Sequence, residues 1–203
     1  MISLAITGGI GSGKTFVSDL LKRRGIPVYN SDDEAKRLML SDEGICQDLV
    51  ALLGKDVYRN GVLNKSLLAS FLFSDARNAA RINAIVHPRV MADFQRWLSE
   101  HQDVEIAGLE CAILYEAGFE DAVDCVLMVY APESLRIERA MKRDGATEKQ
   151  IRDRIAAQMD DEEKRLRADF VVYTDGNIPV EEQLSELIKQ IKTKNNHGIN
   201  LGV

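Results

Sequence analysis

Apolar residues change their spacing repeatedly along this chain, and each change marks an expected strand or helix. Residues 2–7 form a short run of branched apolar side chains, which is typical of a buried strand. Similar runs recur at residues 26–29, 104–111, 125–130 and 170–173. Helical spacing begins at Phe16 and returns between the later runs. This alternation predicts the α/β class, with a parallel five-stranded sheet covered by helices on both faces.

The stretch between the second and third predicted strands has helical spacing and almost no strand signal. It contains a long helical pattern from Ala76 to Leu98, with Pro88 as a local break, and a turn at Asn60-Gly61. We therefore expect an all-helical insertion over about residues 41–100. An insertion at this place is a natural site for a substrate.

Helical spacing also dominates the chain after the fourth predicted strand. One helix is expected to begin at Thr147, a candidate N-cap, and to reach about Leu166. A last amphipathic helix is expected from Val180 to Lys192, and the tail from Asn195 onward is expected to be frayed.

The eight residues after the first predicted strand fit the G-x-x-x-x-G-K-[ST] pattern of a P-loop. Four glycines fall in this stretch: Gly8, Gly9, Gly11 and Gly13. They allow positive φ values, so that successive N–H groups can turn toward an anion. Lys14 can reach the β- and γ-phosphates, and the Thr15 hydroxyl can ligate Mg²⁺. Because a strand precedes the loop and a helix follows it, we predict a site for a nucleoside triphosphate rather than a chance glycine-rich turn.

A carboxylate follows the second predicted strand. Asp32 is placed there, and ligands of open α/β sheets bind at the carboxyl ends of the strands. It is the best candidate for the base that a phosphoryl acceptor hydroxyl needs. With about equal weight, Asp32 could instead be the N-cap of a helix that begins at Asp33.

Three arginines share one face of a predicted helix, because Arg136, Arg139 and Arg143 lie at i, i+3 and i+7. Taken alone, this pattern more often marks a solvated face that is paired with acidic neighbours. Beside a P-loop it also fits an arginine-bearing lid that closes on the triphosphate.

Two further polar residues have open interpretations. His87 could contact a substrate, although a satisfied core histidine at a helix kink is favoured by the sequence alone. Glu116 follows the third predicted strand and could contact a Mg²⁺-bound water or the substrate, or be an ordinary loop carboxylate. The chain lacks an N-K-x-D guanine motif, so a small-molecule kinase is the most natural enzyme class.

The composition narrows the partners and the compartment. The chain has 203 residues, 45% of them hydrophobic and 29% charged, which suits a single domain over residues 1–203. A net charge of −6 argues against nucleic acid as a partner, and no window is apolar enough to span a membrane. Two of the three cysteines, Cys111 and Cys125, lie in apolar, strand-like runs, where a buried free thiol behaves as a small hydrophobe, and this fits a reducing compartment. We therefore expect a cytoplasmic monomer or weak homo-oligomer.

An ordered set of motifs resembles the dephospho-CoA kinase family over about the first 180 residues. Residues 4–14 are similar to the family's L-T-G-G-I-G-S-G-K start, and residues 28–32 to its V-[IV]-D-[AC]-D segment. Later matches are residues 85–88 to L-x-H-P, 113–116 to L-L-[FY]-E and 138–144 to Q-x-x-R-x-x-x-R-[DN]. The P-loop alone is shared with many kinases, whereas the ordered set is far more specific.

The resemblance implies a three-layer P-loop kinase fold with a helical substrate-binding insertion and a helical lid over about residues 136–166. The implied reaction moves the γ-phosphoryl group of ATP to the ribose 3′-hydroxyl of dephospho-CoA, the final step of coenzyme A biosynthesis, with ATP and Mg²⁺ required. The implied catalytic residues are Asp32, Lys14 and Arg143. The implied ATP-binding residues are Gly8, Gly9, Gly11, Ser12, Gly13, Lys14, Thr15, Phe16, Arg139 and Arg143. Dephospho-CoA would contact Asp32, His87 and Glu116, and the metal would contact Thr15.

Three positions depart from the family pattern. Asn30 stands where the family often has a first aspartate, which leaves Asp32 as the base, and Ala112 replaces a common proline. Residues 173–176 replace an asparagine-containing turn near the expected adenine site. The alternatives are another small P-loop kinase, acting on a nucleotide or sugar, and a non-catalytic nucleotide-binding regulator. Asp32 and the arginine row argue against the regulator, which would need no hydroxyl base.

Overall fold

The computed structural model describes residues 1–75 and 77–196. Ala76, at the start of the expected long helix, and residues 197–203 of the expected frayed tail lie outside the described residues. The chain divides into two compact units. One comprises residues 1–29 and 100–203, and the other comprises residues 30–99.

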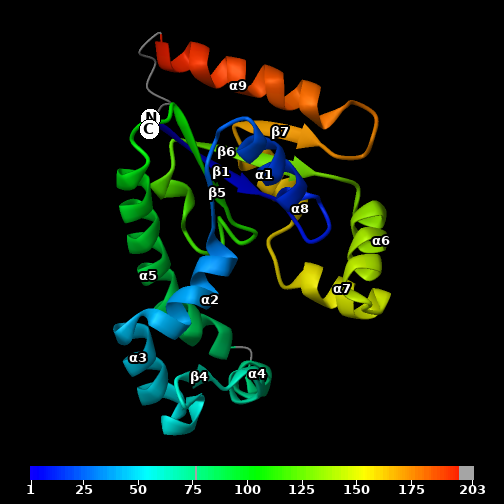
Figure 1. Ribbon diagram of the computed structural model, residues 1–203. Coiled ribbons are helices and arrows are strands. Elements are labelled where there is room, and N and C mark those ends of the chain that lie inside the picture. The colour runs from blue at the N-terminus through cyan, green and yellow to red at the C-terminus, as the bar shows by residue number, and fades with distance from the viewer. Residues whose placement is uncertain (76, 197–203) are drawn as a thin grey trace. The chain divides into compact units, whose positions relative to one another are not determined.

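A five-stranded sheet forms the centre of the first unit (Figure 1). Its strands are β1 (Ile2–Thr7), β2 (Val28–Asn30), β5 (Ile106–Glu110), β6 (Cys125–Tyr130) and β7 (Phe170–Tyr173), in the spatial order β2-β5-β1-β6-β7. The central strand β1 pairs in parallel with β5 and β6, and β6 pairs in parallel with β7. The predicted parallel sheet of the α/β class is confirmed.

All six residues of β1 are buried, as expected for a strand with a neighbour on each side. Leu4 and Ile6 belong to an apolar core that also holds side chains of α1 (Lys14–Arg23) and α9 (Val180–Asn196). Val17 and Leu187 are examples from these two helices. This core fixes the carboxyl end of β1, from which the P-loop emerges. No described helix is both long and apolar enough to cross a membrane.

The remaining helices of the first unit lie between β6 and β7 in sequence. They are α6 (Glu133–Asp144), α7 (Glu148–Ala156) and α8 (Asp161–Arg167), and a short 3₁₀ turn, η2 (Glu120–Ala122), precedes β6. The capping box of Thr147 and Gln150 forms as predicted. The expectation of one helix to Leu166 is wrong, because the chain leaves helical geometry after Ala156 and restarts where the Asp160 carboxylate accepts from the N–H groups of the first turn of α8.

The second unit is mainly helical. It contains α2 (Ser31–Ser41), α3 (Glu43–Leu53), the 3₁₀ turn η1 (Lys55–Val57), α4 (Lys65–Ser74) and α5, which runs from Asn78 to Glu100 and so ends one residue beyond this unit. The helix α5 continues through Pro88, where a local break was expected. Val86 and Val90 are buried on either side of the proline, so packing holds the helix despite one missing N–H donor.

The expectation of an all-helical insertion is wrong in one detail. Two short strands, β3 (Tyr58–Arg59) and β4 (Val62–Leu63), pair in an antiparallel hairpin. The turn residues Asn60 and Gly61 have φ values of 53° and 75°, the left-handed pair that a two-residue hairpin turn requires. Strands of two residues are too short to show alternation, so only the turn was visible in the sequence.

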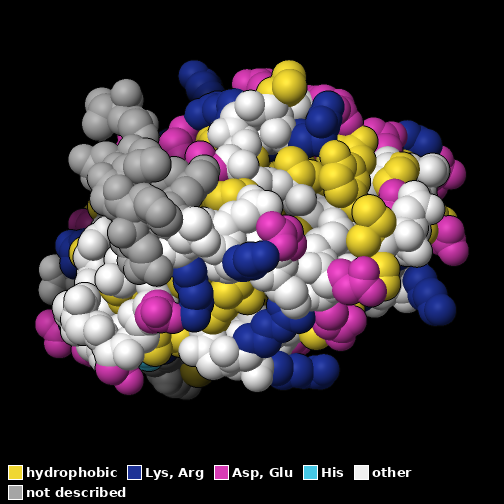
Figure 2. Space-filling view, turned by 90° about the horizontal axis from the view of Figure 1, so that it is seen from above, with side chains coloured by type: hydrophobic (Ala, Val, Ile, Leu, Met, Phe, Trp, Pro, Cys, Tyr) yellow, Lys and Arg dark blue, Asp and Glu magenta, His cyan; other side chains and the backbone are white. Residues whose placement is uncertain are grey.

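Charged side chains of both signs mix on the surface. The face seen from above in Figure 2 shows Lys and Arg interspersed with Asp and Glu.

Candidate active site

The P-loop follows β1. At two of its positions the backbone passes so close to other main-chain atoms that only glycine fits. Gly8 has a φ of 149°, and a Cβ atom there would lie 2.4 Å from the carbonyl oxygen of Val129. Gly11 has a φ of 79°, and its Cβ would lie 2.1 Å from the carbonyl oxygen of Arg136. Any side chain at these positions would push the loop away from β6 and α6. The loop therefore presents bare backbone, as phosphate binding requires.

Lys14 is the first residue of α1, where the positive end of the helix dipole adds to its charge. Its Nζ atom donates hydrogen bonds to the carbonyl oxygens of Gly8 at 2.7 Å and Gly9 at 3.0 Å. The N-cap residue, Gly13, gives α1 no side-chain cap, so the first N–H groups of the helix have no such acceptor. Ammonium and amide donors thus gather at one point.

A residue that the sequence analysis missed lies beside Thr15. Glu110 ends β5, the neighbour of β1, and its Oε1 atom accepts a hydrogen bond of 3.0 Å from the Thr15 hydroxyl. Glu110 is only 6% exposed, and its Oε2 atom is buried without a hydrogen-bond partner in the part of the chain that the structure describes. Burial of an unpaired carboxylate oxygen costs free energy, so a ligand that contacts this atom would be bound favourably. The signal in the sequence was an acidic residue near the carboxyl end of a predicted apolar strand.

The oxygen atoms of Thr15 and Glu110 fit a divalent cation. Mg²⁺ prefers hard oxygen ligands and is usually held by one or two protein groups together with phosphates and water. The pair supplies a hydroxyl and a carboxylate at the carboxyl ends of adjacent parallel strands. These residues are chemically suited to hold the predicted metal.

The three arginines of the predicted row separate into three different environments. Arg136 is buried and forms an ion pair of 3.2 Å with Asp161. Arg139 donates to the hydroxyl of Thr174 at 3.0 Å and to its carbonyl oxygen at 2.6 Å. Only Arg143 remains largely exposed, at 65% of its side chain. Tertiary packing therefore divides the predicted row, because it buries Arg136 and ties Arg139 to Thr174.

Arg143 is held by its neighbour in sequence. Its Nε atom donates to Asp144 at 2.7 Å, and this hydrogen bond raises the pKa of the guanidinium above its ordinary value. Arg154 also pairs with Asp144, at 3.0 Å, and so joins α7 to the end of α6. An exposed pair of this kind is weak, so Arg143 can exchange Asp144 for a phosphate oxygen at little cost.

Thr174 is a second residue that the sequence analysis missed. Its hydroxyl donates to the carbonyl oxygen of Ser12 at 2.6 Å and accepts from Arg139. Thr174 thereby ties the segment after β7 to the P-loop, and it brings Arg139 to the same place. Residues 173–176 depart from the family pattern near the expected adenine site, but no side chain there was assigned from the sequence.

Glu116 is engaged with the start of α8. Its Oε1 atom pairs with Lys164 at 2.9 Å and accepts a hydrogen bond of 2.8 Å from the N–H of Met159. Lys164 is fully buried and also donates to the carbonyl oxygen of Ala112 at 2.9 Å. Of the three interpretations of Glu116, these contacts fit best a loop carboxylate, one that holds the segment before α8.

In the second unit, the structure rules out one of the two interpretations of Asp32. The N-cap of α2 is Asn30, whose side chain accepts hydrogen bonds of 3.1 Å from the N–H groups of Asp32 and Asp33. The alternative that Asp32 is the N-cap is therefore wrong, and its exposed carboxylate stands in the first turn of the helix. His87 is half-buried in α5, and burial lowers the pKa of its imidazole.

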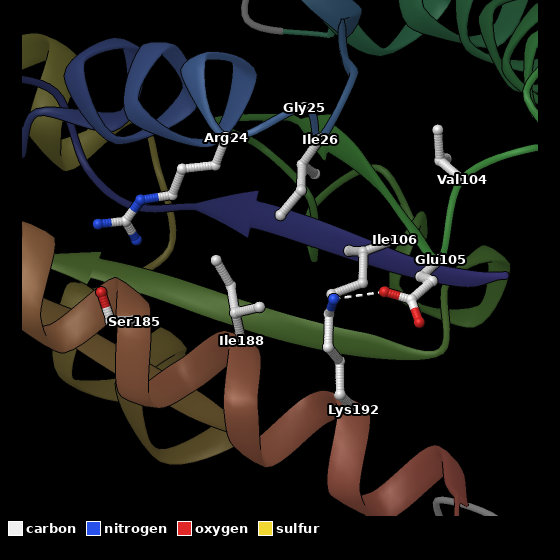
Figure 3. A pocket seen from close by; sticks show the side chains of 9 residues that line it. All are labelled: Arg24, Gly25, Ile26, Val104, Glu105, Ile106, Ser185, Ile188 and Lys192. Carbon is white, nitrogen blue, oxygen red and sulfur yellow. Dashed lines mark ion pairs between the residues drawn. The ribbon is translucent and has the colours of Figure 1, made fainter.

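A pocket of about 360 Å³ lies at the amino-terminal edge of the same sheet (Figure 3). Its polar side chains are already engaged with other protein groups. Lys192 pairs with Glu105, and Arg24 donates to the carbonyl oxygen of Glu181 at 2.8 Å. Ser185 donates to the same carbonyl oxygen at 2.7 Å. This pocket is lined by satisfied groups, in contrast to the edge that carries the P-loop.

Comparisons with known proteins agree with this geometry. The family model for dephospho-CoA kinase matches residues 2–180. A dephospho-CoA kinase of Bacteroides fragilis is 50% identical over 187 residues, which cover 92% of this chain and 91% of the relative. The crystal structure of TT1252 from Thermus thermophilus is 33% identical, with a TM-score of 0.81 and coverage of 93% and 96%. A dephospho-CoA kinase from Campylobacter jejuni shares the fold, with a TM-score of 0.69 at 19% identity and coverage of 95% and 98%.

Proposed function

The chain belongs to the dephospho-CoA kinase family, and from this premise we propose which residues carry its reaction, the transfer of the γ-phosphoryl group of ATP to the ribose 3′-hydroxyl of dephospho-CoA. The observation that carries the assignment is the group formed by Lys14, Thr15 and Glu110 at the carboxyl ends of β1 and β5. A P-loop cradle, a cation and a buried carboxylate with a spare oxygen suit a metal-bound triphosphate.

On the donor side, we assign the triphosphate to the backbone of Gly8–Thr15. Lys14 would exchange its two loop carbonyls for β- and γ-phosphate oxygens. Arg143 would leave Asp144 and stabilise the charge on the transferring group, because its side chain is exposed and weakly held. Arg139, fixed by Thr174, would lie closer to the nucleoside, as would Phe16, whose ring is exposed near the end of the loop.

We assign the metal to Thr15 and Glu110, and Mg²⁺ is the ion that this donor set and a triphosphate suit best. When bound, the ion neutralises charge on the β- and γ-phosphates. The hydroxyl of Thr15 and the carboxylate of Glu110 would hold the ion. The buried Oε2 atom of Glu110 supports this role, because the atom otherwise lacks a partner among the described residues.

On the acceptor side, we assign Asp32 as the base for the 3′-hydroxyl. Its carboxylate is exposed and does not cap its own helix, so it is available for that work. We place His87 among the residues that contact dephospho-CoA. Glu116 would act on the same side through Lys164 and the segment before α8, as a positioning residue rather than by direct contact.

The compartment and the assembly state are part of the proposal. The three cysteines, Cys46, Cys111 and Cys125, are free, which supports a reducing compartment such as the cytoplasm. We propose that the enzyme works there as a monomer or weak homo-oligomer, without a nucleic-acid or membrane partner.

A coupled assay of ADP release tests the substrate assignment. Dephospho-CoA should support turnover with ATP and Mg²⁺, whereas nucleoside monophosphates and simple sugars should not. Phosphate placement on the 3′-hydroxyl can be read from the product by ³¹P NMR. Turnover with a nucleoside monophosphate alone would favour another small P-loop kinase, and nucleotide binding without any turnover would favour a regulator.

A further inference from the structure

A buried ion pair lies directly against the P-loop. The side chains of Arg136, from α6, and Asp161, from α8, are only 5% and 9% exposed, and they approach to 3.2 Å. Neither residue was given a separate role by the motifs, since Arg136 was one of three arginines in a row. The two residues are 25 positions apart in the sequence, and their pair joins α6 to α8 beside the loop.

The pair contacts the backbone of the loop rather than its side chains. The Nη1 atom of Arg136 donates to the carbonyl oxygen of Ile10 at 3.4 Å. At Gly9, a Cβ atom would lie 2.2 Å from Nη1 of Arg136 and 2.6 Å from both carboxylate oxygens of Asp161. At Gly11, a Cβ would meet the main chain of Arg136 at 2.1 Å. The backbone of the loop therefore packs directly against this ion pair.

The chemistry of the pair is poorly explained by stability alone. Burying two charges is expensive, and apolar residues of similar size often replace such pairs without loss. Here the Nε atom of Arg136 is buried without a hydrogen-bond partner among the described residues, and the Oδ2 atom of Asp161, which makes the 3.2 Å ion pair, has no hydrogen bond there either. A pair with incomplete hydrogen bonding contributes little net stability, so its location at the loop suggests another purpose.

The helix that carries Asp161 is fixed at a second point. Lys164 lies one turn further along α8 and is anchored to Ala112 and Glu116 after β5. Burial raises the pKa of Asp161, while Arg136, Lys164 and Lys14 act to lower it, as does a hydrogen bond from the backbone of Gly9. The carboxylate therefore interacts with the phosphate-binding lysine as well as with the loop.

We propose that the Arg136–Asp161 pair is a positioning element for the P-loop, which holds the backbone of Gly9–Gly11 against α6 and α8 so that its N–H groups are arranged for the triphosphate before ATP binds. Misplacement of a phosphate cradle by about 1 Å can cost about 10²-fold in rate. The pair acts through the loop and does not itself touch the reacting atoms.

Asp161→Asn tests the proposal, because it removes the charge and leaves the shape. We expect kcat/KM for ATP to fall about 10- to 100-fold, with KM for dephospho-CoA within about twofold of the wild type. ATP binding is measured in parallel by calorimetry, at a temperature where circular dichroism shows the variant to be folded. The matched control is Glu120→Gln, which removes the carboxylate paired at 2.6 Å with Arg167 at the far end of α8. The control should keep the wild-type ATP affinity.

The double variant Arg136→Met/Asp161→Leu separates positioning from stability. An apolar replacement of both charges should restore the melting temperature lost in Asp161→Asn. If the pair positions the loop, the double variant should still bind ATP more weakly than the wild type, even though its stability is restored. Wild-type ATP affinity in the double variant would overturn the proposal, and so would an Asp161→Asn enzyme whose ATP affinity and kcat/KM equal those of Glu120→Gln.

Discussion

The two edges of the central sheet carry similar side chains and differ in what those side chains contact. Each edge has a lysine, a hydroxyl and a glutamate. At the amino-terminal edge, Lys192 pairs with Glu105 and the Ser185 hydroxyl donates to a main-chain carbonyl, beside a pocket of about 360 Å³ (Figure 3). At the carboxyl-terminal edge, Glu110 accepts one hydrogen bond and keeps a second, buried oxygen without a partner among the described residues.

The contrast shows that the volume of a pocket indicates function less well than polar groups that lack hydrogen-bond partners. Internal pairing at the amino-terminal edge leaves little for a ligand to gain, because a ligand would have to break those interactions. The P-loop instead offers an uncapped helix start, a lysine on two main-chain carbonyls and a carboxylate oxygen in need of a partner. A metal-bound triphosphate would satisfy all of them.

The largest expected effect comes from the acceptor base. Asp32→Asn should lower kcat by about 10²–10⁴-fold, because a general base contributes that much to a proton transfer, while ATP binding stays close to wild type. Steady-state kinetics and calorimetry measure the two quantities. The control is Asp33→Asn, the next residue in the first turn of α2, whose exposed pair with Lys36 is worth little. Equal activity of the two variants would remove Asp32 from the catalytic residues.

A lysine exchanged at each edge tests the contrast directly. Lys14→Met should lower kcat by about 10²–10³-fold, the loss typical of one charge-stabilising group in a preorganised site. Lys192→Met, at the amino-terminal edge, should leave kcat and KM within about twofold of the wild type. Comparable losses in both variants, measured by ADP release, would contradict the assignment of the phosphate site to one edge.

The corresponding glutamates give a smaller, metal-specific effect. Glu110→Gln should raise the Mg²⁺ concentration needed for half-maximal activity by about 10- to 100-fold, because supporting groups around a metal contribute affinity of that order. The matched variant Glu105→Gln should leave the Mg²⁺ dependence unchanged. An unaltered Mg²⁺ titration of Glu110→Gln, in a protein that folds normally, would show that Thr15 and the nucleotide hold the ion without this carboxylate.

The smallest effect concerns the second unit and the protonation of His87. Burial lowers the pKa of this imidazole in the folded state, so below about pH 6.5 the unfolded chain binds more protons than the native one. Stability is therefore full above that pH and declines as pH falls through it. Urea titrations at pH 7 and pH 5.5 should show a smaller decline for His87→Gln than for the wild type. The same decline in both would assign the acid sensitivity to other groups.

Local patterns predicted much of the fold. The strands β6 and β7 have the predicted bounds, and the third predicted strand is only trimmed at its ends to β5. All three strands are mainly apolar, and β5 and β6 are also almost fully buried, so the signal lies in contiguous residues. The break between α7 and α8, the hairpin at Asn60-Gly61 and the N-cap at Asn30 were missed or misassigned, because each depends on a few polar atoms rather than on hydrophobic spacing.

The sequence by itself determined the phosphate-binding loop, because Gly8–Thr15 is contiguous and its glycines alone permit the backbone that a triphosphate needs. Only the tertiary structure decided what surrounds that loop. Glu110 reaches Thr15 across 95 residues, and Thr174 reaches Ser12 across 162. The tertiary structure also divided the arginine row, because Arg136 is buried against Asp161 rather than exposed on the surface of its helix. Helical spacing tells which residues share a face, whereas their partners depend on which distant segment packs against it.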